Sequence, residues 1–280
     1  MAVLACASLC SRVAVATPEE PARVLVLHSY HPGYEWTDLL NQGMIARLVR
    51  GVQQERIYVE YLDSRRFHGP QHLAQVEALL RSKYHELSPN VLLTSDDDAF
   101  RFILSRRDTL FPGVPVVFCG INAYERSWEA LQPRWFTGIV EGDGIEQNLR
   151  LIRGLHPNAR RIVVVTDPSP LGVRFSEETR QYAQDPSLTG GASLEIWDAI
   201  DAATLEQRLT ALPRDTPVFL AIRQRDPAER YFSYTVDVPR LVAQMSAPIY
   251  AQWGFLLGRG VVGGYMNDPR EHGEIGRAHV

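Results

Sequence analysis

The residues best suited to chemistry lie in short polar segments that directly follow apolar, β-branched runs. Carboxylates, amides and guanidinium groups in such segments can hold the charged groups of a small ligand, and aromatic rings can cover its apolar surface. Because open parallel sheets bind ligands beyond the carboxyl ends of their strands, these segments define a candidate ligand-binding site. Its residues are Ser29, Tyr30, Tyr34, Trp36, Ser95, Asp96, Asp97, Asn122, Asp167, Arg223 and Trp253.

Each charged group in this set also has an alternative role. The acidic run 96–98 either holds a cationic or polyhydroxyl ligand or caps a helix N-terminus, where carboxylates accept hydrogen bonds from free amides. In one division of these roles, Asp96 caps the helix and Asp97 faces the ligand. Arg223 and Arg225 either bind a carboxylate through two hydrogen bonds or are solvated at the surface. Residue types alone leave these alternatives open.

The aromatic residues of the first segment, Tyr30, Tyr34 and Trp36, either stack on a ligand or pack beneath the first helix. Their neighbours are polar, Gly or Pro residues, which make a poor core, so ligand contact is favoured. His28 and His31 resemble a metal pair in their spacing, but they occupy a strand-exit loop rather than one helix face. Zinc needs three or four ligands, and no third is identifiable. We therefore predict no metal site.

Residues 258–263 match the dinucleotide fingerprint Gly-x-Gly-x-x-Gly, but their position argues against that function. The fingerprint joins a first strand to a helix, whereas this copy lies near the C-terminus and is followed by Gly264, Tyr265 and Pro269 rather than by a helix. The sequence contains no Gly-x-Ser-x-Gly elbow, no Gly-x-x-x-x-Gly-Lys loop and no His-Glu-x-x-His motif. It therefore predicts neither catalytic residues nor a cofactor.

The elements that position the candidate residues alternate between apolar strands and amphipathic helices. The predicted strands lie within 23–28, 57–62, 91–93, 114–118, 138–140, 161–165, 194–196, 218–222 and 248–250. The predicted helices lie within 39–49, 70–87, 98–104, 145–155, 175–183, 203–212 and 238–245. The alternation predicts an α/β fold with parallel sheets, and its restart after a break at 156–159 predicts two similar Rossmann-like lobes.

The composition is that of a globular chain large enough for two domains. Of 280 residues, 45% are hydrophobic and 22% are charged, which excludes a disordered tail, a collagen-like repeat and a polytopic membrane protein. The formal net charge of −4 provides no basic field for nucleic acid, so we expect no nucleic-acid partner.

Both ends of the chain differ from the part between them. Residues 2–10 are apolar or small and precede the triplet Ala14, Val15 and Ala16, which predicts a secretory signal peptide at residues 1–16 and a periplasmic location. Residues 274–280 match translated sequencing-adapter DNA. We therefore expect these residues to be non-native and the natural chain to continue past Gly273.

Several segments taken in order resemble the substrate-binding proteins of ABC transporters with the type I periplasmic-binding fold. The resemblance is greatest to the version fused to bacterial histidine kinases and diguanylate cyclases as an extracytoplasmic sensor. The segments that carry it are 24–31 with 36–38, 91–96, 115–122, 155–167 and 260–264. It implies a first lobe at 22–145 with a return segment at about 253–273, and a second lobe at 146–252. The last helix of the first lobe is expected to be missing, as in a C-terminally truncated chain.

The resemblance implies two lobes that close over a small polar ligand, such as an amino acid, a purine or a carboxylate. Two partners are then possible: a membrane-anchored signalling module in a sensor, or a permease in a transport receptor. An exported α/β enzyme is a third reading. The residues that would distinguish the first two readings lie beyond Gly273.

Overall fold

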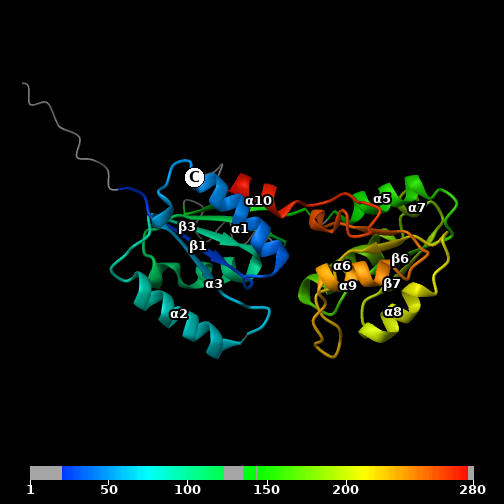
Figure 1. Cartoon of the computed structure of the whole chain (residues 1–280), viewed down its shortest axis with the longest axis horizontal. Coiled ribbons are helices and arrows are strands. Elements are labelled where there is room, and N and C mark those ends of the chain that lie inside the picture. The colour runs from blue at the N-terminus through cyan, green and yellow to red at the C-terminus, as the bar shows by residue number, and fades with distance from the viewer. Residues whose placement is uncertain (1–20, 68, 123–134, 143, 277–280) are drawn as a thin grey trace, which may run out of the picture.

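The computed structural model describes residues 21–67, 69–122, 135–142 and 144–276. The predicted signal peptide, residues 1–16, lies outside the described residues, as do positions 277–280 of the segment expected to be non-native. The described chain forms two α/β lobes that lie side by side (Figure 1).

The first lobe contains a five-stranded parallel sheet in the order β2-β1-β3-β4-β5. Its strands are β1 (Val24–His28), β2 (Ile57–Tyr61), β3 (Val91–Ser95), β4 (Val116–Ile121) and β5 (Phe136–Val140). Its helices are α1 (Glu35–Leu48), α2 (Pro70–Tyr84) and α3 (Asp96–Leu110), and a short 3₁₀ turn, η1 (Gln54–Arg56), precedes β2. Successive side chains point to opposite faces, so Val24 and Val26 pack against α1 while Leu25 and Leu27 pack against α2 and α3.

The second lobe repeats this arrangement with a four-stranded parallel sheet in the order β7-β6-β8-β9. Its strands are β6 (Arg161–Val165), β7 (Ser193–Trp197), β8 (Val218–Leu220) and β9 (Ile249–Ala251). Its helices are α5 (Ile145–Leu155), α6 (Pro170–Tyr182), α7 (Pro186–Thr189), α8 (Ala202–Thr210) and α9 (Tyr234–Val242). The expectation of two parallel sheets covered by helices is confirmed, although the single-turn helix α7 was not predicted.

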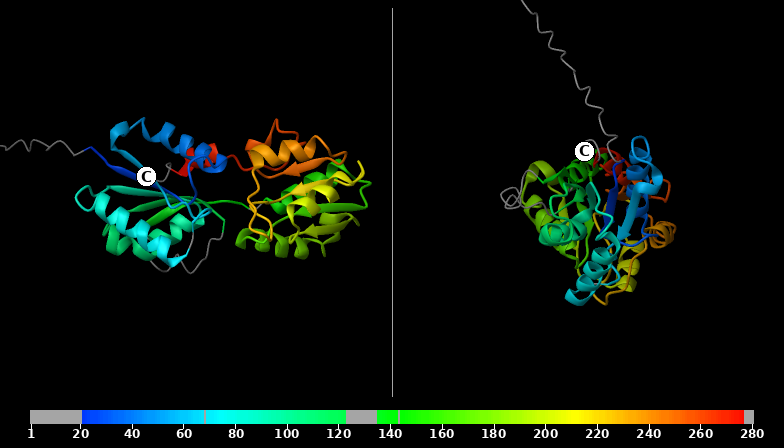
Figure 2. Two further views of the ribbon diagram at one scale, coloured as in Figure 1. Left: turned by 60° about the horizontal axis from the view of Figure 1, so that its bottom comes forward. Right: turned by 90° about the vertical axis from the view of Figure 1, so that its left-hand side faces the viewer.

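The chain returns to the first lobe through a 3₁₀ turn, η2 (Gly254–Leu256), and a helix, α10 (Pro269–Gly276). Figure 2 shows α10 beside α1, and the two helices are in extensive contact. The expectation that this lobe would lack a last helix is therefore wrong, whereas no helix directly follows residues 258–263, as the sequence indicated. A Cβ on Gly43 would lie 2.2 Å from the Arg270 carbonyl oxygen, and one on Gly273 would lie 2.2 Å from that of Leu40. These glycines allow the close approach, and they also hide the helix from a hydrophobic pattern.

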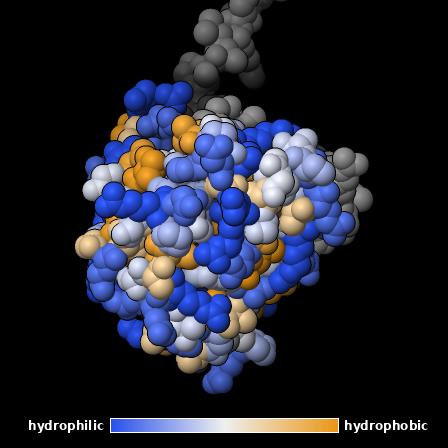
Figure 3. Space-filling view, turned by 90° about the vertical axis from the view of Figure 1, so that its right-hand side faces the viewer, coloured by the Kyte–Doolittle hydropathy of each residue, from blue (hydrophilic) through white to orange (hydrophobic). Residues whose placement is uncertain are grey.

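The outer surface of the second lobe is mainly hydrophilic, with apolar residues scattered among polar ones (Figure 3). Such single exposures are ordinary for folded chains. Within the described ranges, the helices are too short or too polar to cross a bilayer.

Candidate ligand-binding site

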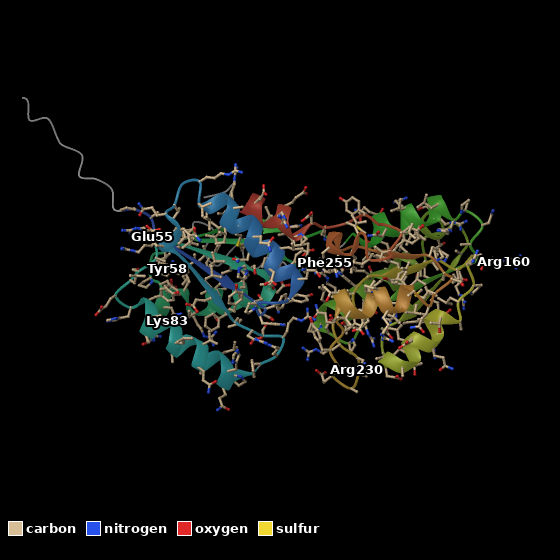
Figure 4. All side chains as sticks on the ribbon, in the orientation of Figure 1. Glu55, Tyr58, Lys83, Arg160, Arg230 and Phe255 are labelled. Atoms are coloured by element: carbon tan, nitrogen blue, oxygen red, sulfur yellow. The ribbon has the colours of Figure 1, made fainter. Side chains whose placement is uncertain are left out.

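Two adjacent chambers lie between the lobes. Both are partly open to solvent, and both are lined by Tyr30, Leu171 and Gln224. The other residues of the inner chamber are Tyr34, Trp36, Asp96, Asn122, Glu141, Ile222, Tyr234, Trp253 and Phe255. Those of the outer chamber are Ser64, Arg65, Asp97, Asp98, Arg101, Pro168, Ser169, Pro170, Arg174, Arg225 and Glu229. Figure 4 shows Phe255 at the junction of the lobes, whereas Tyr58 and Arg160 lie far from it in opposite lobes.

Aromatic rings form most of the apolar wall of the inner chamber. The rings of Trp36, at the start of α1, and Trp253, after β9, meet edge to face with centroids 5.2 Å apart. The Tyr234 and Phe255 rings lie 5.7 Å apart in a similar geometry. The indole Nε1 of Trp253 is buried and has no hydrogen-bond partner among the described residues. Buried donors are normally satisfied, so this group is available to a ligand.

Asp96 is placed in the inner chamber by an unusual backbone conformation. It follows β3 with φ of 64°, in the left-handed region that Asp adopts more readily than most residues. Its carboxylate accepts hydrogen bonds from Trp36 Nε1, at 2.8 Å, and from Ser95 Oγ, at 2.9 Å. The side chain is 2% exposed, and burial raises its pKa to about 8.

Glu141, which follows β5, provides a second buried carboxylate in the same chamber. Asn122 Nδ2 donates to its Oε2 at 2.9 Å, and Asn267 Nδ2 donates to its Oε1 at 2.7 Å. Burial, and then the negative charge of Asp96, raises the pKa of Glu141 to about 8. Sequence reasoning missed this residue, although the rule that selected the other strand-exit residues would have found it.

Arg65, in the loop after β2, is the second functional candidate that sequence reasoning missed. Its guanidinium carbon lies 4.1 Å from the ring centroid of Tyr34, 5.5 Å from that of Tyr30 and 5.4 Å from that of Tyr231. Tyr231 belongs to the second lobe, so the arginine is enclosed from both sides of the junction. The residue is 9% exposed, and its Nε, Nη1 and Nη2 have no hydrogen-bond partner among the described residues. Burying an unpaired cation is costly, so an anionic ligand that bonds to this guanidinium would stabilise it.

Seven of the predicted site residues line the chambers. Tyr30, Tyr34, Trp36, Asp96, Asn122 and Trp253 line the inner chamber, and Asp97 lines the outer one. In the suggested division of roles in the acidic run, the capping role of Asp96 is wrong, because α3 has no side-chain cap hydrogen bond and its N-cap residue is Ser95. Instead, Ser29 Oγ accepts a hydrogen bond from the Ala99 amide at 2.8 Å. Asp96 is therefore available to a ligand. Asp97 lines the outer chamber, as that division suggested.

The serines predicted as ligand contacts lie behind the chamber wall. Ser29 Oγ donates to the carbonyl oxygen of Ser95 at 2.6 Å and so joins the ends of β1 and β3. Ser95 Oγ lies 2.8 Å from Nδ1 of His28, which is fully buried, and burial lowers the pKa of that imidazole to about 4. His28 is therefore neutral at physiological pH. These contacts support the wall rather than reach a ligand.

Asp167 and Arg223 also line neither chamber. Asp167 accepts hydrogen bonds from the amides of Ser169 and Gln224, which fixes the loops that leave β6 and β8. Arg223 Nη2 donates to the Ile200 carbonyl oxygen at 2.6 Å, and its side chain lines a separate small cavity within the second lobe. We assign both residues structural roles in place of the predicted ligand contact. The described part of the chain contains no group of three or more potential metal ligands.

No family model and no curated protein matches this sequence. Solved structures do resemble the chain. A Streptococcus pneumoniae ABC domain in complex with L-Trp has a TM-score of 0.62 at 14% identity, over 93% of this chain and 83% of that one. An ABC-transporter periplasmic sugar-binding protein of Legionella pneumophila has a TM-score of 0.56 at 16% identity, over 91% of this chain and 92% of that one.

A conserved domain protein of Vibrio cholerae is similar over 91% of this chain and 82% of that one, with a TM-score of 0.58 at 18% identity. At such identities the likeness concerns the fold. The chain therefore has the fold of the type I periplasmic binding proteins.

Proposed function

We propose that this chain is an extracytoplasmic binding protein whose two lobes close over a small polar ligand. The observation that supports this most directly is the inner chamber, where two buried carboxylates and an aromatic wall converge between the lobes. Largely apolar chambers with a few converging polar groups are typical of small-molecule sites. Ligand binding would shift an equilibrium between open and closed arrangements. A periplasmic location is part of this proposal.

Contacts across the junction support closure as the mechanism. Arg174 of the second lobe donates to the backbone oxygen of Asn122 in the first. Arg225 Nη2 donates to the backbone oxygen of Arg65 at 3.1 Å. Both contacts use backbone acceptors at the chamber rim, so they depend on the relative position of the lobes. A ligand that touches both lobes would favour the arrangement in which these contacts form.

The test is a thermal-shift screen followed by calorimetric titration, with amino acids, purines and small carboxylates as probes. We expect at least one probe to raise the melting temperature, and Trp253→Phe to weaken its binding. The matched control is Trp197→Phe, which changes a buried tryptophan that lines neither chamber. Equal binding in wild type and Trp253→Phe would place the ligand elsewhere, and a screen without any response would contradict the proposed function.

Within this function we propose a sensor domain that passes closure to a membrane-anchored histidine kinase or cyclase encoded beyond Gly273. A transport receptor that docks on a permease is the second candidate, because the structural neighbours include ABC-transporter solute-binding proteins. Genomic DNA downstream of the Gly273 codon distinguishes the two. An apolar stretch of about 20 codons would support the sensor, and an early stop codon would support the receptor.

A further inference from the structure

We propose that the cleft binds an amino carboxylate whose two charged groups are separated by a spacer. Its cationic nitrogen would lie at Asp96 and Glu141 in the inner chamber, and its carboxylate would lie at Arg65 in the outer chamber. This inference rests on the proposed function and names the ligand class of the same site. The chambers share Tyr30, Leu171 and Gln224, which would line the spacer.

Among the residues that the structure describes, the inner chamber holds acids without a counterion. No Lys, Arg or His belongs to its described lining. Each carboxylate oxygen of Asp96 and Glu141 accepts one hydrogen bond from a neutral side chain. A carboxylate oxygen has two acceptor sites, so capacity remains on each. Burying acids without a cation is costly, and a ligand ammonium would remove that cost.

The outer chamber holds the complementary charge at Arg65. Other charged groups of this chamber already have partners: Arg225 is paired with Glu229, and Asp98 accepts a hydrogen bond from Ser64 Oγ at 2.6 Å. Asp97 Oδ2 accepts a longer hydrogen bond from the Asn122 amide at 3.3 Å. The guanidinium of Arg65, by contrast, lies against the rings of Tyr30, Tyr34 and Tyr231, and its three nitrogens have no hydrogen-bond partner that meets geometric criteria among the described residues. A ligand carboxylate can bind such a fork through two hydrogen bonds.

The separation of these charges sets the ligand class. Asp96 and Glu141 line the inner chamber but not the outer one, and Arg65 lines the outer chamber but not the inner one. An α-amino acid carries its ammonium and carboxylate on one carbon atom and would satisfy only one chamber. An amino carboxylate with a flat or extended spacer would satisfy both, and the tyrosine and tryptophan rings favour an apolar spacer.

Constitutional isomers test this point directly. The probes are para-aminomethylbenzoate and its isomer phenylglycine, and ε-aminocaproate and its isomer norleucine, each titrated calorimetrically into the full chain. We expect the separated isomer to bind about 10- to 100-fold more tightly in at least one pair, the range of a charge-assisted hydrogen-bond contribution. Tighter binding of the α-amino acid in both pairs would overturn the inference.

Variants of Arg65 test the assignment of the carboxylate. Arg65→Gln should weaken the binding of para-aminomethylbenzoate about 10- to 100-fold. The affinity for benzylamine, which lacks the carboxylate, should stay unchanged. The benzylamine titration also shows that the variant folds. The matched control, Arg66→Gln, removes the neighbouring exposed arginine, which lines neither chamber, and should alter neither affinity by more than about twofold. Arg65→Lys, which keeps the positive charge, should restore part of the lost affinity.

The possible outcomes separate this inference from the proposed function. If Arg65→Gln lowers the affinities for benzylamine and para-aminomethylbenzoate equally, Arg65 does not bind the ligand carboxylate. Binding of sugars, purines or α-amino acids without any separated amino carboxylate would overturn the ligand class while the proposed function stands. The absence of any bound probe in either screen would contradict both.

Discussion

Asp96 and Asp167 are two buried carboxylates that both follow a central strand, yet they occupy different environments. Asp96 is 2% exposed and Asp167 is 0% exposed. Asp167 Oδ1 accepts from the amide and hydroxyl of Ser169, and its Oδ2 accepts from the amides of Gln224 and Arg225. Among the described residues, Asp96 accepts one hydrogen bond on each oxygen, both from side chains.

The difference shows how a structural acid can be distinguished from a ligand-binding acid at equivalent strand ends. Asp167 uses all the acceptor capacity of its carboxylate to join the loops after β6 and β8. Asp96 keeps acceptor capacity and faces a chamber whose described lining residues include no cation. Both acids are buried, so burial does not distinguish them. They differ in the number of protein groups that donate hydrogen bonds to the carboxylate, and matched substitutions can test whether that difference matters.

The largest expected effect is a loss of stability in Asp167→Ala. The substitution leaves three backbone amides and one hydroxyl without their acceptor in a buried site, and each unsatisfied group costs about 1–3 kcal/mol. Water and loop relaxation offset part of this, so we expect a loss of about 4 kcal/mol in the free energy of unfolding. Denaturant unfolding measures it. Asp167→Asn, which keeps one acceptor oxygen, should lose less, and a loss below about 1 kcal/mol in Asp167→Ala would remove the contrast.

Asp96→Asn should reverse this pattern, with little loss of stability and a large loss of binding. Asn tolerates the left-handed backbone at this position and can still accept from Trp36 Nε1. For a cationic ligand we expect the dissociation constant to rise about 10- to 100-fold, which corresponds to about 1.4–2.7 kcal/mol. Calorimetric titration with the cationic probe that binds wild type measures the change. Unchanged affinity would show that Asp96, like Asp167, is a structural acid.

The pH dependence of stability provides the next test. Burial raises the folded-state pKa of Asp96 from 3.8 to about 8, so the folded chain retains a proton that the unfolded chain releases. The resulting stabilisation is fully present below about pH 4 and is lost as pH rises through about 8, with a slope of at most about 1.4 kcal/mol per pH unit. Melting temperatures between pH 5 and pH 8 should therefore fall less in Asp96→Asn than in wild type.

Ligand binding should have the opposite pH dependence over the same range. A cationic ligand requires an ionised Asp96 or Glu141, and both pKa values are raised to about 8 in the unliganded chain. Affinity should therefore increase as pH rises toward 8 and proton release should accompany binding. Affinity that falls steadily between pH 6 and pH 8 would indicate that the acids bind the ligand in their protonated form.

The strands could be predicted from the sequence, but the different roles of Asp96 and Asp167 could not. The sequence pattern predicted every strand of both sheets. It is strongest for β1, β3, β4 and β6, whose apolar runs are almost entirely buried. The strand-exit rule predicted Asp96, Asn122 and Trp253 in one chamber, but it treated Asp167 in the same way. Donors to Asp167 come from the loop after β8, at positions 224 and 225. Such long-range hydrogen bonds leave no local pattern in the sequence.

Arg65 and Arg223 illustrate the same limit for cations. Sequence reasoning chose Arg223, which follows β8, yet its guanidinium bonds to the Ile200 carbonyl oxygen away from the chambers. Arg65 follows β2 at the sheet edge and is enclosed by Tyr34 of its own lobe and Tyr231 of the other. The side-chain direction and the approach of the second lobe decide which arginine faces the cleft. Neither property can be inferred from residue type.

The smallest expected effects come from the serines that donate to the two acids. Ser169→Ala removes a hydrogen bond to Asp167 and the N-cap of α6, where Ser169 Oγ accepts from the Gly172 amide at 3.1 Å. We expect a loss of about 1–2 kcal/mol in the free energy of unfolding. Ser95→Ala removes the hydrogen bonds that Ser95 Oγ makes with Asp96 and with His28 Nδ1, and should also cost about 1–2 kcal/mol.

The two serine variants differ in a second measurement, the pH dependence of melting. The hydrogen bond from Ser95 lowers the pKa of Asp96, in opposition to the larger effect of burial. Its removal should raise that pKa further, so the fall in stability should extend to higher pH in Ser95→Ala. Ser169 makes no contact with Asp96, and Ser169→Ala should keep the wild-type pH profile at a lower melting temperature. Parallel profiles for both variants would mean that Asp96 does not control the pH dependence, because only one of the two serines reaches it.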